Sequence, residues 1–120
     1  MSTSTPSEIP DSYAAMRHLH WSPSEKAIAR IAFESALKRE FEVLIRETKQ
    51  MAAAIAQSDD LWDLEDHLTR RRKEIDRVYD YRYSVLLVVF GYLVREGRLR
   101  MEELNGLAED KLASIRTCAS

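Results

Sequence analysis

The sequence predicts an all-α protein, a long-helix homodimer with a smaller helical head region in its C-terminal part. Three observations favour this fold class. Helix breakers are scarce, because the 120 residues include only three glycines and three prolines, and two of the prolines lie in the first ten residues. Apolar residues recur at spacings of three and four through most of the chain, which is the period of an amphipathic helix. No segment shows the alternation of apolar and polar residues that is typical of a half-buried strand.

Length and composition indicate one globular domain and argue against several classes of function. A chain of 120 residues with 45% hydrophobic and 32% charged residues is long enough to bury a core. Its 18 basic and 20 acidic residues give a net charge of −2, so no global positive field attracts nucleic acid. The longest apolar run, from Tyr83 to Val94, is too short to span a bilayer. We therefore expect no nucleic-acid partner and no membrane insertion.

Residues 1–21 are predicted to form a disordered tail, and residues 22–120 a single helical, dimerising domain. The opening segment MSTSTPSEIPDSYAAM is polar and lacks the apolar run of a secretion signal. The single cysteine, Cys118, excludes a disulfide within the chain, as is usual in a reducing compartment. We therefore expect a cytoplasmic protein. His18 and His20 lie two residues apart in the tail, and two histidines alone are a weak basis for a metal site.

The first helix is predicted to begin after Ser22 and to continue to about Gln57. Ser22 suits the N-cap, Pro23 suits the first helical position, and Glu25 completes a capping box. At 1.5 Å per residue the helix is about 50 Å long, too long for a compact monomer of this size. Its apolar stripe is therefore expected to pack against a second chain. The stripe comprises Leu37, Phe41, Leu44, Thr48, Met51 and Ile55.

A second helix is predicted to begin at a cap formed by Ser58 or Asp59. Acidic residues cluster in its first turn, where they interact favourably with the helix dipole. Its apolar residues recur at spacings of three and four, and two arginines, Arg71 and Arg82, interrupt this pattern. Whether the helix bends near Asp80 is left open. The apolar positions are Leu61, Leu64, Leu68, Ile75, Val78, Val85 and Val89.

The smaller helical head is predicted to start after about Asp80. From Tyr83 onward the helix is apolar on all sides, as expected of a segment that is buried all round. Gly97 is predicted to end this helix in the left-handed conformation of a C-cap. One last helix then follows, with apolar residues at Met101, Leu104, Leu107, Leu112 and Ile115.

One face of the second helix is unusual, because it carries a tryptophan among charged residues. At 100° per residue, the apolar stripe of this helix lies about 160° to 240° around the axis from Trp62. A large aromatic ring on a charged face is rarely left in contact with water. One interpretation is that the face binds another protein, with the indole as its anchor. The face comprises Trp62, Asp66, Arg72, Glu65, Thr69 and Lys73.

Other interpretations of this face remain open. In the first, Trp62 packs against the other subunit of a dimer while the charges are solvated, and the pattern supports this as well as it supports partner binding. Nucleic-acid binding by the run from Arg70 to Lys73 is disfavoured, because consecutive residues point in all directions and acidic residues surround them. An enzyme or metal centre would use His67 with Asp63, but one such pair lacks further ligands or a nucleophile. We therefore expect no catalysis and no metal centre.

The run DDLWDLEDHLTRRRKEIDRVYDYRYSVLLVVFGYLVREGRL resembles the fluorescence recovery protein family of cyanobacteria, whose members are small all-helical dimers. The similarity extends from about Trp21 to Ile115 and is strongest at DDLW-L-D, R-EID--YD-R-SV and EELN-LA-DK. A surface patch of the family carries over to this chain as Trp62, Asp66 and Arg72.

The resemblance implies a regulator without a cofactor of its own. Such proteins bind the photoactivated orange carotenoid protein and accelerate its return to the resting form. They thereby end phycobilisome quenching, a form of non-photochemical quenching used in photoprotection. In a cyanobacterium the protein is then expected to be cytoplasmic and associated with the thylakoid.

Two positions depart from the family pattern. Members have a histidine before the patch aspartate and an aromatic residue after it, where this chain has Glu65 and His67. Glu65 replaces a titratable group by a fixed negative charge, and like charges can repel a partner. Homologues are also expected in bacteria that lack the carotenoid protein. The alternative function is therefore a dimeric helical interaction module of the same family that acts on a different partner.

Seven apolar residues of the two long helices are assigned to the core or to dimer contacts. Leu61 lies beside both the charged face and the apolar stripe, so a charge at this position is expected to loosen the dimer. The seven residues are Leu37, Phe41, Leu44, Met51, Leu61, Leu64 and Leu68.

Overall fold

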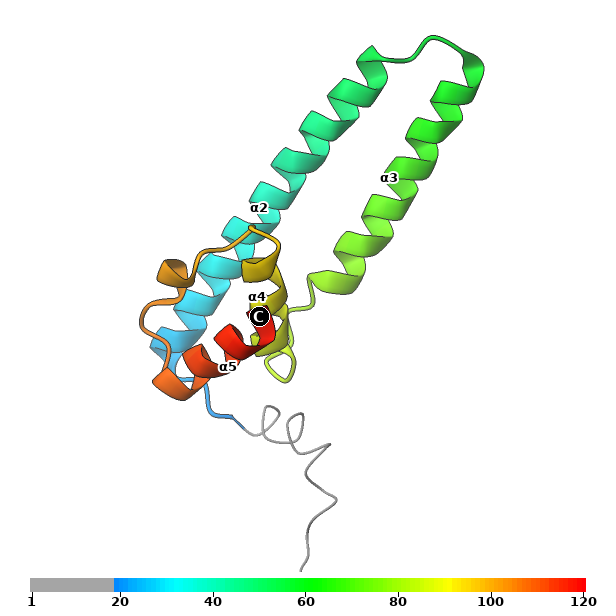
Figure 1. The fold of residues 1–120 in the computed structure, drawn as a ribbon. Helices are drawn as coiled ribbons and strands as arrows, with labels where there is room; N and C mark the ends of the chain where they lie inside the picture. The colour runs from blue at the N-terminus through cyan, green and yellow to red at the C-terminus, as the bar shows by residue number, and fades with distance from the viewer. Residues whose placement is uncertain (1–18) are drawn as a thin grey trace, which may run out of the picture.

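The computed structural model describes residues 19–120, and every regular element in this range is helical. In chain order the elements are α2 (Pro23–Ala53), α3 (Ser58–Val78), α4 (Leu86–Arg95), the 3₁₀ helix η2 (Met101–Leu104) and α5 (Glu109–Ala119). Helices α2 and α3 run antiparallel as a long hairpin, and the three shorter elements form a head beside the N-terminal half of α2 (Figure 1). The all-α fold with a smaller C-terminal head is confirmed.

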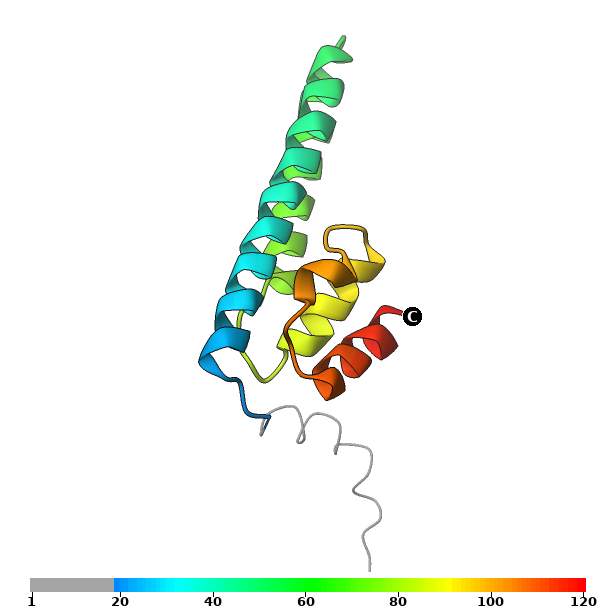
Figure 2. The same ribbon diagram turned by 90° about the vertical axis from the view of Figure 1, so that its left-hand side faces the viewer.

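The hairpin projects far beyond the head. The described part of the chain measures 67 × 32 × 21 Å and has a radius of gyration of 18.4 Å. A compact domain of about 100 residues has a radius of gyration of about 13 Å. Figure 2 shows the hairpin edge-on, with the head to one side of it. The two long helices therefore cover only each other at the end of the hairpin away from the head.

The start of α2 lies where the capping residues predict it. The backbone N–H of Glu25 donates to Ser22 Oγ at 3.1 Å, and the N–H of Ser22 donates to Glu25 Oε1 at 3.0 Å. Together with Pro23 in the first turn, these bonds form the expected capping box.

The connection between the two long helices differs from the prediction. Helix α2 ends at Ala53, not near Gln57, and Gln57 is the N-cap residue of α3 in place of Ser58 or Asp59. The cause is Asp60, whose carboxylate accepts from the backbone N–H groups of Ala56 and Gln57 at 2.9 and 3.0 Å. These bonds favour a turn over a continued helix.

The chain leaves the helical conformation at Tyr79 and resumes it at Leu86, which answers the open question about Asp80. Three tyrosines at alternate positions of this segment pack in a row with Phe33 of α2. Ring centroids are 5.6 Å apart for Phe33 and Tyr79, 4.9 Å for Phe33 and Tyr81, and 5.5 Å for Tyr81 and Tyr83. The aromatic row turns the chain back toward α2 and starts the head.

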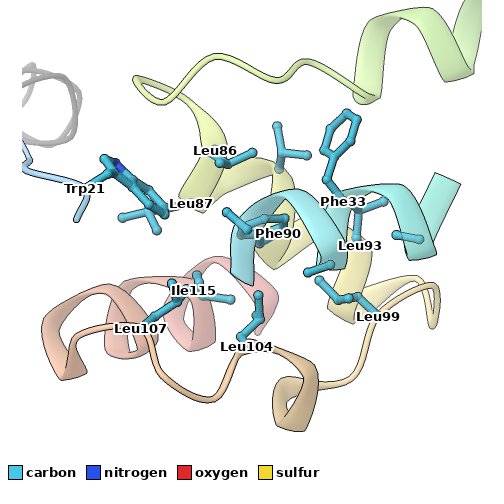
Figure 3. Close-up of a cluster of buried hydrophobic side chains, with 14 residues drawn as sticks. Trp21, Phe33, Leu86, Leu87, Phe90, Leu93, Leu99, Leu104, Leu107 and Ile115 are labelled. Carbon is cyan, nitrogen blue, oxygen red and sulfur yellow. The ribbon is translucent and has the colours of Figure 1, made fainter. Parts of the chain in front are cut away.

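The hydrophobic core lies in the head and is centred on α4. Phe90, Leu86 and Leu93 are fully buried (Figure 3). The prediction that this helix is buried on all sides is nevertheless too broad, because Tyr92 and Val94 are only partly buried. From α2 the core receives alanines at the helical spacing and Phe33, and small side chains allow α4 to approach closely. The α2 residues are Ala29, Ala32, Phe33 and Ala36; η2, α5 and their flanking segments add Leu99, Leu104, Leu107 and Ile115.

Trp21 belongs to this core, so the prediction that the tail includes residue 21 is wrong. Its side chain is 5% exposed, lies 5.3 Å from the ring of Tyr83, and has the Lys111 ammonium 5.1 Å from its own ring. Both partners are remote in the sequence, and no local pattern indicates them. The prediction is wrong for the two preceding residues as well, because Leu19 packs against the core and the His20 carbonyl accepts from Lys111 Nζ at 2.7 Å. The rest of the predicted tail, residues 1–18, lies outside the described residues.

The last predicted helix is two elements. Gly97 ends the α4 region with φ of 79°, as predicted, but a second glycine, Gly106, has φ of 108° and separates η2 from α5. An L-residue rarely adopts this conformation, so the glycine permits the break. Leu104 and Leu107 are nevertheless both buried, one on each side of the turn.

The seven apolar residues assigned to core or dimer contacts lie outside this core. Phe41, Leu61 and Leu68 are 44%, 48% and 39% exposed, and the other four are partly exposed. The prediction that they belong to the core of a single chain is therefore wrong. The prediction that they form dimer contacts stays a prediction. No helix within residues 19–120 is both long and apolar enough to cross a bilayer.

Candidate functional site

The candidate site is the side of α3 that faces away from α2. Trp62 is 60% exposed on this side. The structure brings all six predicted residues together there, because Glu65, Asp66, Thr69, Arg72 and Lys73 are also exposed. Their role in binding a partner stays a prediction.

Polar contacts with α2 fix the rotation of α3 and so hold the indole outward. Arg71 Nη2 donates to Glu40 Oε2 at 2.6 Å, and Arg71 Nε donates to Glu47 Oε1 at 3.3 Å. His67 Nε2 lies 3.2 Å from Glu47 Oε1. His67 and Arg71 lie about 140° and 180° around the helix axis from Trp62. The side of α3 that carries Trp62 must therefore face solvent.

Glu40 connects the hairpin to the head. Its carboxylate accepts from Arg71, from the Tyr79 hydroxyl at 2.9 Å and from Arg98 Nε at 3.1 Å. Burial raises the pKa of Glu40, but these three hydrogen bonds outweigh burial and leave the pKa below its ordinary value. Burial beside the same carboxylate raises the pKa of the Tyr79 hydroxyl. Helices α2 and α3, the segment between α3 and α4, and the turn after α4 thus share one buried charged centre.

Sequence reasoning missed this centre. Arg71 is an interruption of the apolar pattern when α3 is considered alone, and Glu40 is one of many acidic residues. One signal was present in the sequence, namely the position of Arg71 on the apolar side of the helix. A buried arginine needs a carboxylate opposite it, so this position predicts an acidic residue on the facing helix.

A shallow groove of about 520 Å³ adjoins the candidate site on α3. Leu61, Leu64 and Leu68 form its apolar part. Four residues of the candidate site also line it: Glu65, Thr69, Arg72 and Lys73. The predicted partner-binding residues and the predicted dimer contacts of α3 are therefore contiguous.

The apolar surface continues onto α2. Phe41 follows Glu40 in the sequence, and Leu68 follows His67, so each is rotated by about 100° in the same sense from the contact between the helices. In an antiparallel pair, equal rotations of this kind bring two side chains to the same side. One side of the hairpin thus exposes Phe41 and Leu68 together with Leu61, and we call it the apolar side.

The second cavity, of about 300 Å³, lies where the hairpin meets the head, and its lining includes Glu40, Arg71, Tyr92 and Arg98. The cavity's two arginines are both engaged by Glu40. Across residues 19–120, no three histidine, cysteine, aspartate or glutamate side chains are grouped so that they could hold a metal ion. His67 pairs with Glu47 and not with Asp63, and His18 lies outside the described residues.

Comparison with known proteins gives one consistent result. Residues 21–119 match the family model of the photoprotection regulator fluorescence recovery protein. The fluorescence recovery protein of Synechocystis sp. is 42% identical over 99 residues, which are 82% of this chain and 91% of that protein. Two solved structures, the fluorescence recovery proteins of Fremyella diplosiphon and of Synechocystis, superpose with TM-scores of 0.80 at 41% and 42% identity. Each superposition covers 83% of this chain and 98% of the other.

Proposed function

The chain belongs to the family of the photoprotection regulator fluorescence recovery protein, and from this premise we propose that it binds the photoactivated orange carotenoid protein. Binding accelerates the return of that protein to its resting form and so ends quenching of the phycobilisome. The chain performs this role without catalytic chemistry of its own and acts in the cytoplasm, and in a cyanobacterium it acts next to the thylakoid.

The observation that carries the proposal is the 60% exposure of Trp62 on a helix whose rotation is fixed. Tryptophan and arginine are enriched among the residues that dominate binding energy at protein interfaces. Trp62 supplies the apolar anchor, and the exposed Asp66 and Arg72 set the register of the partner by charge.

The mechanism is differential binding. A protein that accelerates a conformational return must bind the transition arrangement more tightly than the activated one. A rigid hairpin can contact both separated domains of its target at once. Holding the two domains near each other lowers the entropy that their re-docking costs.

The same proposal includes a homodimer. The apolar side of the hairpin, with Phe41, Leu61 and Leu68, is an exposed apolar surface that a second chain can cover. Because the groove on α3 includes both Leu61 and Arg72, dimerisation leaves the partner-binding residues at the edge of the subunit interface.

A second candidate function is favoured by one observation at the site. Glu65 is exposed and lines the groove, whereas His67 is directed toward Glu47 of α2. Of the two departures from the family pattern, only Glu65 therefore alters the exposed face, by adding a fixed negative charge to it. The alternative is an interaction module of this family whose partner is a protein other than the carotenoid protein.

Dark-recovery kinetics test the proposal. The orange carotenoid protein is photoactivated, and the decay of its red form is followed with and without an equal concentration of this chain. We expect faster decay with the unaltered chain, and a loss of most of that acceleration with Trp62→Ala. Glu65→His separates the two candidates, because activity that appears only in this variant assigns the natural chain to another partner. No acceleration by either protein would contradict the carotenoid protein as partner.

A further inference from the structure

The outer side of α3 is divided by charge along its length. Residues 58–66, nearest the end of the hairpin, carry five acidic side chains and no lysine or arginine. Residues 67–78, nearest the head, carry five lysines and arginines and two acidic side chains. The exposed members are Asp59, Asp63, Glu65 and Asp66 in the first half, and four basic residues (Arg70, Arg72, Lys73 and Arg77) with one acidic residue (Asp76) in the second.

These exposed charges have no partners within residues 19–120. Every ion pair that α3 forms there involves His67 or Arg71, on the side that faces α2. Two pairs of opposite charge at i and i+4 are available on the outer side, Asp66 with Arg70 and Arg72 with Asp76, and neither is closed. Such pairs often form on isolated helices because they stabilise the helix slightly. The charges on this surface are therefore free to interact with another molecule.

The helix dipole does not account for the division. Its effect decays within the first and last turns of a helix, where Asp59 and Arg77 lie. Asp63, Asp66 and Arg70 lie in the interior turns, at the boundary between the two halves. Solubility does not require the division either, since interspersed charges serve that purpose as well.

We propose that this surface binds a protein segment of the opposite polarity, with basic side chains facing the end of the hairpin and acidic side chains facing the head. The proposal rests on the function proposed above and specifies the chemistry of the partner's surface. Residues 59–77 span about 27 Å at 1.5 Å per residue, so the segment has a similar length. Trp62 lies in the acidic half, where a lysine or arginine of the partner can contact the indole face and the carboxylates together.

The polarity fixes one orientation of the partner. A segment turned end for end would place like charges opposite each other in both halves, and like-charge contacts disfavour wrong complexes. A uniformly basic or uniformly acidic partner, such as a nucleic acid, would be attracted to one half of this surface and repelled by the other.

Charge reversal in each half tests the proposal with the photoactivated orange carotenoid protein as the probe. The variants are Asp59→Lys with Asp63→Lys in the acidic half and Lys73→Glu with Arg77→Glu in the basic half. The control is Arg46→Glu with Lys49→Glu, which changes the charge as much on exposed positions of α2. We expect roughly tenfold slower association for both reversals at low ionic strength. At 0.5 M salt, where surface charges are screened, the association rate should fall by less than about twofold. The control should associate at the unaltered rate.

An unchanged rate for either reversal, or an equal loss in the control, would overturn the charge-divided surface and leave the proposed function intact.

If the unaltered chain does not bind the carotenoid protein, the proposed function fails, and a second probe decides the inference. This probe is a pair of helical alanine-based peptides of identical composition, one with four lysines followed by four glutamates in blocks, the other with these residues alternating. Roughly fivefold tighter binding of the block peptide, lost in the Lys73→Glu and Arg77→Glu variant, supports the inference, and equal binding of both peptides refutes it.

Discussion

Arg71 of α3 and Glu40 of α2 form an ion pair with 2.6 Å between Nη2 and Oε2, and their side chains are only 13% and 10% exposed. The contact fixes the side of α3 that faces α2, and thereby the side that faces solvent. Removing one partner of a buried ion pair leaves the other charge uncompensated, which costs about 3–5 kcal/mol. Glu40→Ala should therefore lower the free energy of unfolding by about this amount, measured by urea denaturation at one fixed protein concentration.

The control for this prediction is Glu34→Ala. The Glu34 side chain is 65% exposed and lies 4.0 Å from Arg30, so its removal should change stability by less than about 0.5 kcal/mol. Equal stability of the Glu40→Ala and Glu34→Ala variants would show that the buried centre contributes little to holding the hairpin and head together.

Local features of the fold could be predicted from the sequence, whereas features that depend on remote contacts could not. The capping box at Ser22 and the left-handed Gly97 each involve residues within one turn of each other, and both are confirmed. The outward direction of Trp62 follows from helical periodicity alone. The burial of Trp21 depends on Tyr83 and Lys111, so the sequence around Trp21 contains no signal for it.

Two errors have a different origin, because their signals were present. Gly106 follows an asparagine, and this dipeptide is a common turn signal, yet the apolar spacing around it suggested one continuous helix. The spacing was preserved because both leucines beside the turn are buried. At the candidate site, the position of Arg71 on the apolar side of α3 was the signal for a buried carboxylate, although it did not identify Glu40, which lies 31 residues earlier.

Glu25 gives the fold an acid-sensitive contact. The pKa of its carboxyl is lowered to about 2, first by the Ser22 N–H, against the effect of burial, and then by the Ala108 N–H and by Lys111. A carboxyl with a depressed folded-state pKa stabilises the fold above its ordinary value of 4.5, and this contribution is lost as pH falls toward 2. The contribution is on the order of 3 kcal/mol.

Glu25→Gln should therefore reduce the difference in unfolding free energy between pH 7 and pH 3, measured by urea titration at several pH values. At pH 7 the variant should be less stable, and the two curves should converge as pH falls. Parallel curves for the two proteins would assign the acid sensitivity to other carboxyls, such as Glu40 and Glu103, whose pKa values are also lowered.

Gly91 is required for the contact between α4 and α5. A Cβ atom at this position would lie 2.3 Å from Cys118 Cβ and 3.1 Å from the carbonyl oxygen of Ile115. Because the obstructing atoms are backbone or next to it, Gly91→Ala should destabilise the fold by about 1–3 kcal/mol despite the better helix propensity of alanine. Thermal denaturation measures this loss, and Cys118→Gly in the same chain should restore part of it. Undiminished stability of Gly91→Ala would mean that α5 can shift without cost.

The two tryptophans should respond in opposite ways to truncation. Trp21 is 5% exposed and Trp62 is 60% exposed. Trp21→Ala should cost about 3–5 kcal/mol of stability, whereas Trp62→Ala should change stability by less than about 0.5 kcal/mol. Acrylamide quenching of the Trp21→Ala and Trp62→Ala proteins, each with one indole left, gives an independent readout. Strong quenching of Trp21 or protection of Trp62 in the unbound protein would contradict these positions.

Leu61 tests the dimer through the groove on α3. The side chain is 48% exposed and lies beside Leu64 and Leu68. If a second chain covers this groove, Leu61→Glu places an unpaired charge in an apolar interface and should raise the dimer dissociation constant by at least about tenfold. Gln50→Glu adds the same charge at an exposed position of α2 outside the groove, and it should leave the dimer unchanged. Sedimentation velocity across a dilution series measures both constants, and equal dissociation constants for the two variants would exclude the groove from the subunit interface.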